Sequence, residues 1–580
     1  MSGAGWLQFA ALGLLLVLST RVLGAYMYRV YFTKDAPGDR FFLPVERAAY
    51  RLCGIDPEGE QRWNAYAFSL LAFSLISCLL TYCLLRFQGH LSFNPDGMKA
   101  VGPGVSFNTA VSFLTGTNWQ SYAGEATMSH LSQMLALVVQ QFLAGAAGMA
   151  IAVALIRGLV RKRQASLGSF WVDLVRSITR ILLPITIAFA VVLMSQGVIQ
   201  NFHATRPVTT AAVQTVDTSG ASVHTQRIPG GPVASMTPIE LLGTNGGGFF
   251  NANIAHPFEN PNPISNLLLY WLAFMIPFAF PFTFGRAVGS AAQGGVVLAA
   301  MAVLLIATSV VGYAFEGRGN PALARGGVTQ TVSASQAGGN MEGKDSRLGV
   351  GATIMGSAST ATTAGAPNGA FESFTPIGGS TALVNMLFGE ISPGGDGSGL
   401  YGMLIVVLVS VFIAGLMVGR TPEYLRKKIQ GAEMKLIVLF MLAVPVATLA
   451  FAGAAVTIMS ARHNISAAGP HGLTEVVYAY SSAANGNGSA FAGINATSNW
   501  YLSTLGLAML VGRFFTAIPV LAIGGSLVRK QTVRSSAGTF RTDTPLFFGL
   551  LLGVTLIVVG LTYFPILALG PIVEHLAGHF

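Results

Sequence analysis

The chain contains 580 residues, of which 52% are hydrophobic and only 10% are charged. A soluble domain carries about 25% charged residues, so this composition cannot supply the polar surface of a cytosolic enzyme. The remaining class is a polytopic membrane protein, whose surface is largely covered by lipid. The chain has 69 glycines, about 12% against roughly 7% in average proteins, which indicates backbone that packs closely or turns within the membrane.

Ten apolar stretches are long enough to cross a bilayer, which requires about 20 residues as a helix. The predicted spans are Trp6–Tyr26, Ala65–Phe87, Leu131–Ile156, Ile181–Gln200, Ile264–Phe284, Ala292–Phe315, Leu400–Val418, Leu436–Met459, Trp500–Val528 and Leu546–Leu569. The first stretch has an alternative interpretation as a cleaved signal peptide. Residues 1–20 lack the basic segment of such a peptide, which favours a span.

The basic residues alternate between the two sides of the predicted membrane. Of 33 Lys and Arg residues, 22 lie in the segments 27–64, 157–180, 286–291, 419–435 and 529–545. Short basic segments remain cytoplasmic, so both termini are expected on the outer side. Because the basic residues lie between apolar segments, the net charge of +10 does not indicate a nucleic-acid partner.

Four segments on the outer side contain apolar runs that are too short to cross a bilayer. These runs are Val105–Leu114, Thr237–Leu242, Leu348–Met355 and Thr474–Tyr480. Such runs can re-enter the membrane halfway as half-helices. A small polar tract follows each run, beginning near Thr115, Gly243, Thr362 and Asn485. The order of span, half-helix, polar tract and span therefore occurs four times, which predicts an internal repeat.

The polar tracts suit a cation-binding ring. Glycine permits the left-handed backbone angles that aim successive carbonyls at one axis. Four tracts around a pseudo-fourfold axis could replace the hydration shell of a monovalent cation such as potassium. The half-helices would aim their partially negative C-terminal ends at the same point. A single tract of this kind is more often an ordinary surface loop, but four in register favour a selectivity filter.

The motifs "FLTGTNWQSYAGE", "LLGTNGGGFFNANIAHPFENPNPISN", "NMEGKDSRLG" and "ANGNGSAFAG" resemble those of the potassium-transporting ATPase A subunits, the KdpA family. The resemblance covers essentially the whole chain. It implies an all-α polytopic fold with ten transmembrane helices: four membrane–pore–membrane repeats around a pseudo-fourfold axis and one extra helix at each end. The corresponding ranges are 1–30 for the N-terminal helix, 64–157, 174–287, 292–420 and 434–530 for the repeats, and 545–580 for the C-terminal helix.

The resemblance also implies which residues form the potassium filter, with Gln120 just behind it. The filter residues are Gly116, Thr117, Asn118, Thr244, Asn245, Gly246, Thr363, Ala364, Gly365, Gly486, Asn487 and Gly488. The best-known relatives have Asn, Cys and Asn where this chain has Gly116, Ala364 and Gly486. These changes leave the backbone carbonyls in place, so the number of ligands is unaffected. They can alter the stiffness of the filter, and with it the selectivity for potassium.

The family resemblance implies a subunit of an ATP-driven potassium uptake complex in the bacterial inner membrane. The expected partners are a P-type ATPase subunit (KdpB-like) that binds the ATP, a single-span subunit (KdpC-like), a small KdpF-like peptide, and membrane lipid. Potassium is the transported ion, and no organic cofactor is expected. The chain has no DKTG phosphorylation sequence and no nucleophile–base set, so no catalytic site is predicted. The alternative is an independent potassium channel or carrier of the Trk–Ktr–HKT type.

Two charged residues fall at membrane depth. Arg513 lies in the middle of the ninth span, where an unpaired Arg costs about 2.5–3.5 kcal/mol. Glu390 precedes a Pro- and Gly-rich break, which must face protein or water because lipid cannot satisfy its backbone. We therefore hypothesise that the second helix of repeat three is broken there and that Glu390, Arg513, Gly394 and Gly395 form a gate below the filter. The alternative is a static Glu390–Arg513 ion pair that only fixes helix packing.

Overall fold

The computed structural model describes residues 3–209, 215–216, 222–223, 225–327, 330, 348–417, 419–533 and 540–578. Most of the "NMEGKDSRLG" motif and Val418, the predicted end of the seventh span, lie outside these residues. Within them, ten helices are long and apolar enough to cross a membrane, and strands form only short hairpins. The prediction of an all-α polytopic membrane protein with ten spans is therefore confirmed.

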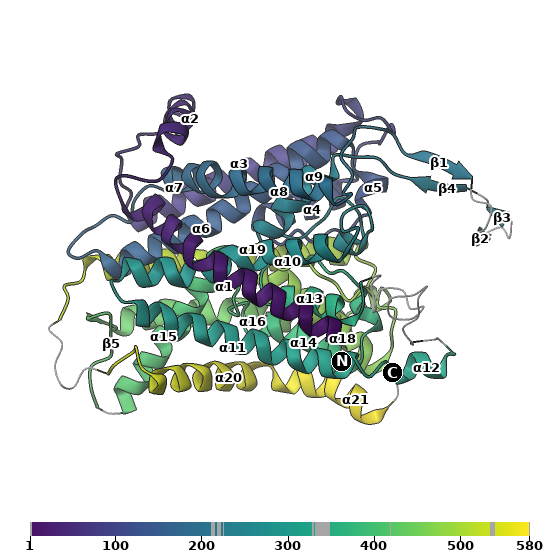
Figure 1. Cartoon of the computed structure of the whole chain (residues 1–580). Helices are drawn as coiled ribbons and strands as arrows, with labels where there is room; N and C mark the ends of the chain where they lie inside the picture. The colour runs from purple at the N-terminus through teal and green to yellow at the C-terminus, as the bar shows by residue number, and fades with distance from the viewer. Residues whose placement is uncertain are drawn as a thin grey trace.

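The spanning helices run roughly parallel through the molecule (Figure 1). They are α1 (Gly3–Phe32), α3 (Trp63–Phe87), α6 (Val139–Val160), α7 (Phe170–Ser177) continued by α8 (Leu183–Ser195), α10 (Pro263–Ala287), α11 (Ala291–Glu316), α15 (Ser398–Met417), α16 (Gly431–Thr457), α19 (Asn499–Arg529) and α20 (Pro545–Leu567). A π-helical segment, Ser132–Val138, leads into α6, and another, Ile178–Leu182, joins α7 to α8.

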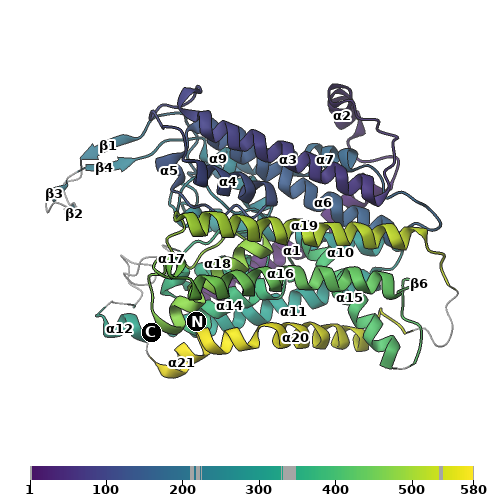
Figure 2. The same cartoon turned by 180° about the vertical axis from the view of Figure 1, so that it is seen from behind.

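The connecting segments gather at two opposite ends of the molecule (Figures 1 and 2). One end carries both termini, α5 (Gly124–Thr127), α12 (Pro321–Arg325) and two hairpins. In these, β1 (Arg206–Thr209) pairs with β4 (Thr225–Ile228), and β2 (Thr215–Val216) pairs with β3 (Ser222–Val223), both antiparallel. The other end carries α2 (Asp39–Cys53) and the hairpin β5 (Glu423–Tyr424) and β6 (Lys427–Lys428). Segments with many and with few basic residues thus lie at opposite ends.

The four short apolar runs are helices that do not cross the molecule. They are α4 (Pro103–Thr115), α9 (Val233–Leu242), α13 (Val350–Ser359) and α18 (Gly469–Asn485). Each ends where a predicted polar tract begins, and their residues toward these ends are buried. The C-terminal ends of these half-helices therefore meet the tracts, as expected from their order in the sequence.

The fourth span begins earlier than predicted and ends earlier. The prediction was Ile181–Gln200, whereas the helical segment covers Phe170–Ser195. The early part of this segment contains acidic and basic residues, which lower its hydropathy. These charges are paired inside the protein: Asp173 pairs with Arg157 at 2.6 Å, and Arg180 pairs with Asp39 at 2.5 Å and with Glu46. Pairing lowers the cost of burying charge, which hydropathy alone does not register.

Candidate functional site

Two of the polar tracts begin with a glycine that closes the preceding helix. Gly116 follows α4 with a φ of 78°, and Gly486 follows α18 with a φ of 86°. This left-handed position at the end of a helix is occupied mainly by Gly and sometimes by Asn, because both adopt it readily. The same geometry explains why Gly stands at both positions.

The first three tracts are joined by direct hydrogen bonds. The side-chain amide of Asn118 donates to the carbonyl of Gly246 at 2.8 Å, which connects tract one to tract two. The hydroxyl of Thr363 donates to the carbonyl of Thr244 at 2.8 Å, which connects tract three to tract two. Gly246 and Gly365 also form a parallel β-bridge.

The fourth tract completes a closed ring. The side-chain amide of Asn487 donates to the carbonyl of Thr362 at 2.9 Å, and a Cβ on Gly365 would overlap the carbonyl oxygen of Asn487. A Cβ on Gly488 would overlap the carbonyl oxygen of Thr117, which brings tract four against tract one. Each tract thus contacts the next in chain order, and backbone meets backbone at positions where only glycine fits.

The carbonyls of the ring fall into two groups. The Gly246 oxygen accepts from Asn118 and also from Gln141 at 3.1 Å, so both of its lone pairs are used. The carbonyls of Thr117 and Asn487 accept no hydrogen bond within the described parts of the chain. Buried carbonyls without a donor normally have another partner, and a dehydrated cation can supply it.

Gln120 lies at the edge of this ring. Its side-chain amide donates to the carbonyl of Gly248 at 2.8 Å and lies 3.3 Å from the hydroxyl of Tyr122. Its position connects tract one to the segment just beyond tract two. Gln120 therefore braces two neighbouring tracts, which agrees with a place near the ring.

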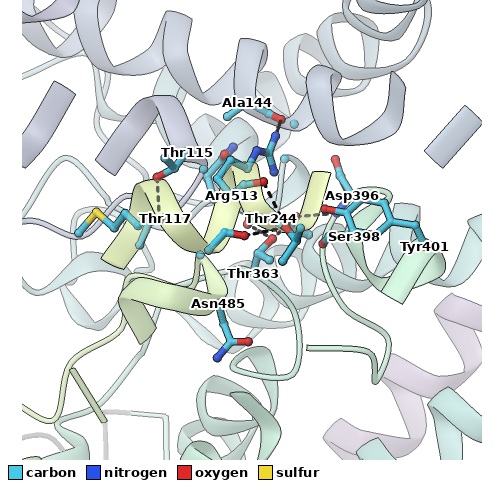
Figure 3. Close-up of a pocket in the computed structure, with 18 residues that line it drawn as sticks. Thr115, Thr117, Ala144, Thr244, Thr363, Asp396, Ser398, Tyr401, Asn485 and Arg513 are labelled. Carbon is cyan, nitrogen blue, oxygen red and sulfur yellow. Dashed lines mark hydrogen bonds between the residues drawn. The ribbon is translucent and has the colours of Figure 1, made fainter. Parts of the chain in front are cut away.

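A cavity of about 40 Å³ adjoins the half-helix ends of the tracts (Figure 3). It has room for a few water molecules. All four tracts contribute to its lining, through Thr117, Thr244, Thr363 and Gly486 among others, and Arg513 of α19 lies on the same cavity. A cation that leaves the ring at this side would meet a positively charged side chain.

Arg513 is held by a backbone group. Its Nη2 donates to the carbonyl of Ala144 in α6 at 3.0 Å (Figure 3). In the part of the chain that the structure describes, no carboxylate lies within 4.0 Å of its guanidinium, so the Glu390–Arg513 ion pair that stood as the alternative to a gate is not found. Asp396, just before α15, lines the Arg513 cavity instead, and neither of its side-chain oxygens has a hydrogen-bond partner among the described residues.

The predicted break in the seventh hydrophobic segment is a loop packed against the tracts. Helix α14 (Pro376–Leu387) ends and α15 begins at Ser398, which leaves residues 388–397 outside both helices. A Cβ on Gly395 would overlap the side chain of Thr363, and the backbone amide of Asp396 donates to the Thr244 hydroxyl at 2.9 Å. The glycines let this loop approach tracts two and three closely.

A second cavity, of about 140 Å³, shares Thr363, Ser398 and Tyr401 with the first. Glu390 lines this second cavity, is 2% exposed and has a φ of 50°, which is rare for a residue with a side chain. Residues of α16 and α20 complete the lining. The two cavities therefore lie next to each other, with the tracts on one side and the loop of residues 388–397 between the helices that line them.

Sequence reasoning missed two residues of this site. Asp396 stands in the same Gly-rich break as Glu390, and an acidic residue there was a visible signal. Gln141 lies in the apolar third span, and its Nε2 donates to the carbonyls of Gly246 and Gly247 at 3.1 and 3.2 Å. A polar amide inside a membrane span signals an internal hydrogen-bond partner, but not which one.

Comparison with known proteins agrees with these features. The chain is similar to the potassium-transporting ATPase potassium-binding subunit of Mycobacterium tuberculosis (strain ATCC 25618 / H37Rv), with 55% identity over 579 residues and all of both chains covered. The subunits of the same name from Sorangium cellulosum and Mesorhizobium japonicum are 50% and 49% identical, with 98% or more of each chain covered. The family described as "KdpA: Potassium-transporting ATPase A subunit" matches residues 10–576. The chain therefore belongs to the KdpA family.

Proposed function

We propose that this chain is the potassium-binding and translocating subunit of an ATP-driven, high-affinity potassium uptake complex. The observation that carries the proposal is the closed ring of four tracts, each at the C-terminal end of a half-helix. The names of its relatives support potassium as the ion. Potassium sheds water at the outer mouth and is coordinated by backbone carbonyls that have no other donor.

The Thr117 and Asn487 carbonyls are among the proposed ligands, because nothing else in the described chain donates to them. The remaining proposed filter residues act by shaping the ring. Asn118 and Thr363 hold neighbouring tracts together through their side chains, and the Asn245 side-chain amide ties tract two to the carbonyl of Gln141 in α6. Stiff tracts favour an ion whose size matches the ring, which makes these side chains determinants of selectivity.

Below the ring, Arg513, Glu390 and the loop of residues 388–397, with Gly394 and Gly395, form the proposed gate. The Arg513 guanidinium repels a cation that would otherwise continue straight toward the cytoplasm. The two neighbouring cavities, which share Tyr401 in their lining, support a path that turns sideways past Tyr401 and Glu390. The acidic side chains of Asp396 and Glu390 would attract a cation along that path.

We propose that the partner reached by this path is a P-type ATPase subunit that binds ATP, as the words "potassium-transporting ATPase" in the relatives' names suggest. A single-span subunit and a small peptide complete the proposed assembly, which lies in the bacterial inner membrane among lipids with both termini outside. The second candidate is an independent potassium channel or carrier. Transport in liposomes distinguishes the two functions. A pump subunit should carry no potassium by itself, and uptake should appear only with the ATP-hydrolysing partner.

The substitution Gly246→Asp tests the ring directly. Gly246 has a φ of 72°, and a Cβ there would overlap the backbone of Gly365, so the added side chain breaks the contact between tracts two and three. We expect the potassium concentration for half-maximal ATP hydrolysis by the assembled complex to rise at least tenfold. Unchanged potassium affinity in a correctly assembled variant would refute the ring as the binding site.

A further inference from the structure

A second cluster of ionisable side chains joins the first turn of α18 to α21 (Val573–Ala577), the helix next to the C-terminus in Figure 1. His471 in the first turn of α18 stands at its centre. The His471 Nε2 lies 3.0 Å from an oxygen of Glu372, and the Nδ1 lies 2.8 Å from an oxygen of Glu574 in α21 (Val573–Ala577). Glu475, one turn further along α18, has an oxygen 3.9 Å from the same Nε2.

Glu475 is the feature that the protein itself leaves unexplained. It is 1% exposed, and neither of its side-chain oxygens has a hydrogen-bond partner among the described residues. Three carboxylates face a single imidazole, and in the described part of the chain no Lys or Arg forms an ion pair with any of them. A buried carboxyl group such as that of Glu475 is unfavourable without a hydrogen bond, unless it is paired or coordinates a metal.

We propose that Glu372, His471 and Glu475 bind a divalent transition-metal ion of the zinc type. One possible ligand atom from each residue lies within 4.8 Å of the other two. Bonds of 2.0–2.1 Å in a tetrahedral site place ligand atoms about 3.3 Å apart, and the measured separations of 3.0 and 3.9 Å lie on either side of that value. Small side-chain rotations therefore complete the site, with water as a fourth ligand.

Glu574 has a separate role in this arrangement. Metal-bound histidines usually donate their other ring N–H to a carboxylate, which orients the ring and raises its basicity. Glu574 accepts at Nδ1, on the side of the ring opposite to the metal position. It is therefore a positioning residue that fixes His471, and it also ties the C-terminal helix α21 to α18.

The metal would fasten two segments that border the outer ends of tracts three and four. Glu372 belongs to the short helix Phe371–Ser373 that follows tract three, and α18 leads into tract four. The His471 ring also lies 6.3 Å from the ring of Phe491, just beyond tract four. A bound ion would thus stabilise the outer mouth of the molecule without touching the potassium ligands.

Metal counting on the assembled complex tests this site. The complex is stripped with a chelator, equilibrated with zinc and analysed for zinc per chain. We expect close to one specific equivalent in the wild type, its loss in His471→Gln and in Glu475→Gln, and affinity weakened about 10–100-fold in Glu574→Gln. The exposed His463, one helix earlier, supplies the matched control His463→Gln, which should bind as the wild type does.

Cobalt substitution provides a readout that requires no variant. A site with one His and two Glu ligands should give the intense visible absorption of four-coordinate cobalt, and zinc should remove it. Equal zinc binding in the wild type and in His471→Gln, or no four-coordinate cobalt spectrum in the wild type, would overturn the proposal. In that case His471 acts as an imidazolium clamp, since hydrogen bonds to Glu372 and Glu574 raise its pKa to about 10.

Discussion

Single glycines in the tracts serve two different purposes. Gly116 and Gly486 close helices in the left-handed region, and a Cβ at either position meets no atom closer than 3.5 Å. Gly246, Gly365 and Gly488 instead lie where one tract touches the backbone of the next. Residues of the same type in the same motif therefore differ in what they tolerate: the first group requires a backbone angle, and the second requires the absence of a side chain.

Gly488→Ala and Gly486→Asn separate these two purposes. In Gly488→Ala the methyl group overlaps the Thr117 carbonyl oxygen at a φ of 90°, so we expect at least a tenfold loss of potassium affinity. Asn adopts the left-handed region readily, so Gly486→Asn should keep affinity within about twofold. Potassium-stimulated ATP hydrolysis by the assembled complex measures both. Similar affinities in the two variants would contradict this division.

Arg513→Ala tests the gate. The substitution removes the positive charge from the cavity next to the ring and leaves Asp396 there without a cation, so we expect leakage of potassium or uncoupling of uptake from ATP hydrolysis. Potassium flux and ATP hydrolysis are measured together in liposomes. Arg21 in α1 is the matched control, because it is an exposed Arg in another span, and Arg21→Ala should keep both rates. Unchanged coupling in Arg513→Ala would remove the gate role.

At the scale of elements, helix ends are joined by buried charged groups. Lys427 in β6 is fully buried, and its Nζ donates to the carbonyls of Gly158 and Leu527 at 2.8 Å each and of Arg161 at 2.5 Å. The ammonium group donates to carbonyls at the C-terminal ends of α6 and α19, where the negative ends of the helix dipoles stabilise a positive charge. Lys427 therefore stabilises the packing of two helix ends, in addition to being one of the basic residues that indicate the cytoplasmic side.

Lys427→Met leaves the carbonyls of Gly158 and Arg161 without a donor among the described residues, whereas the Leu527 carbonyl still accepts from the backbone N–H of Lys530. We expect the unfolding free energy to fall by about 2–3 kcal/mol, because unsatisfied buried acceptors lose both the bond and hydration. Thermal unfolding of the purified protein in detergent measures the change. Lys428→Met is the control, since Lys428 is the exposed next residue and its side chain should contribute little. Equal melting temperatures in the two variants would show that the buried contacts add nothing.

At the scale of the whole molecule, the two ends differ in basic residues, and we expect the basic end to face the cytoplasm. Single cysteines at the exposed positions Glu58 and His203, in a variant whose Cys53, Cys78 and Cys83 are replaced by serine, test this orientation. An impermeant thiol reagent should label Glu58→Cys only from inside and His203→Cys only from outside. Labelling of both positions from one side would exclude the alternating topology.

The amino-acid sequence by itself determined the ten spans, the four half-helices and the positions of the tracts, since hydropathy and glycine content act within a few residues of the chain. It located the span boundaries less well where paired charges begin a helix, as at Asp173 and Arg180. Only the tertiary structure decided that the tracts close into a ring, that no described residue donates to the Thr117 and Asn487 carbonyls, and that Asp396 lies on the Arg513 cavity. These features depend on contacts between residues more than 100 positions apart, and no local pattern records which partner each group meets.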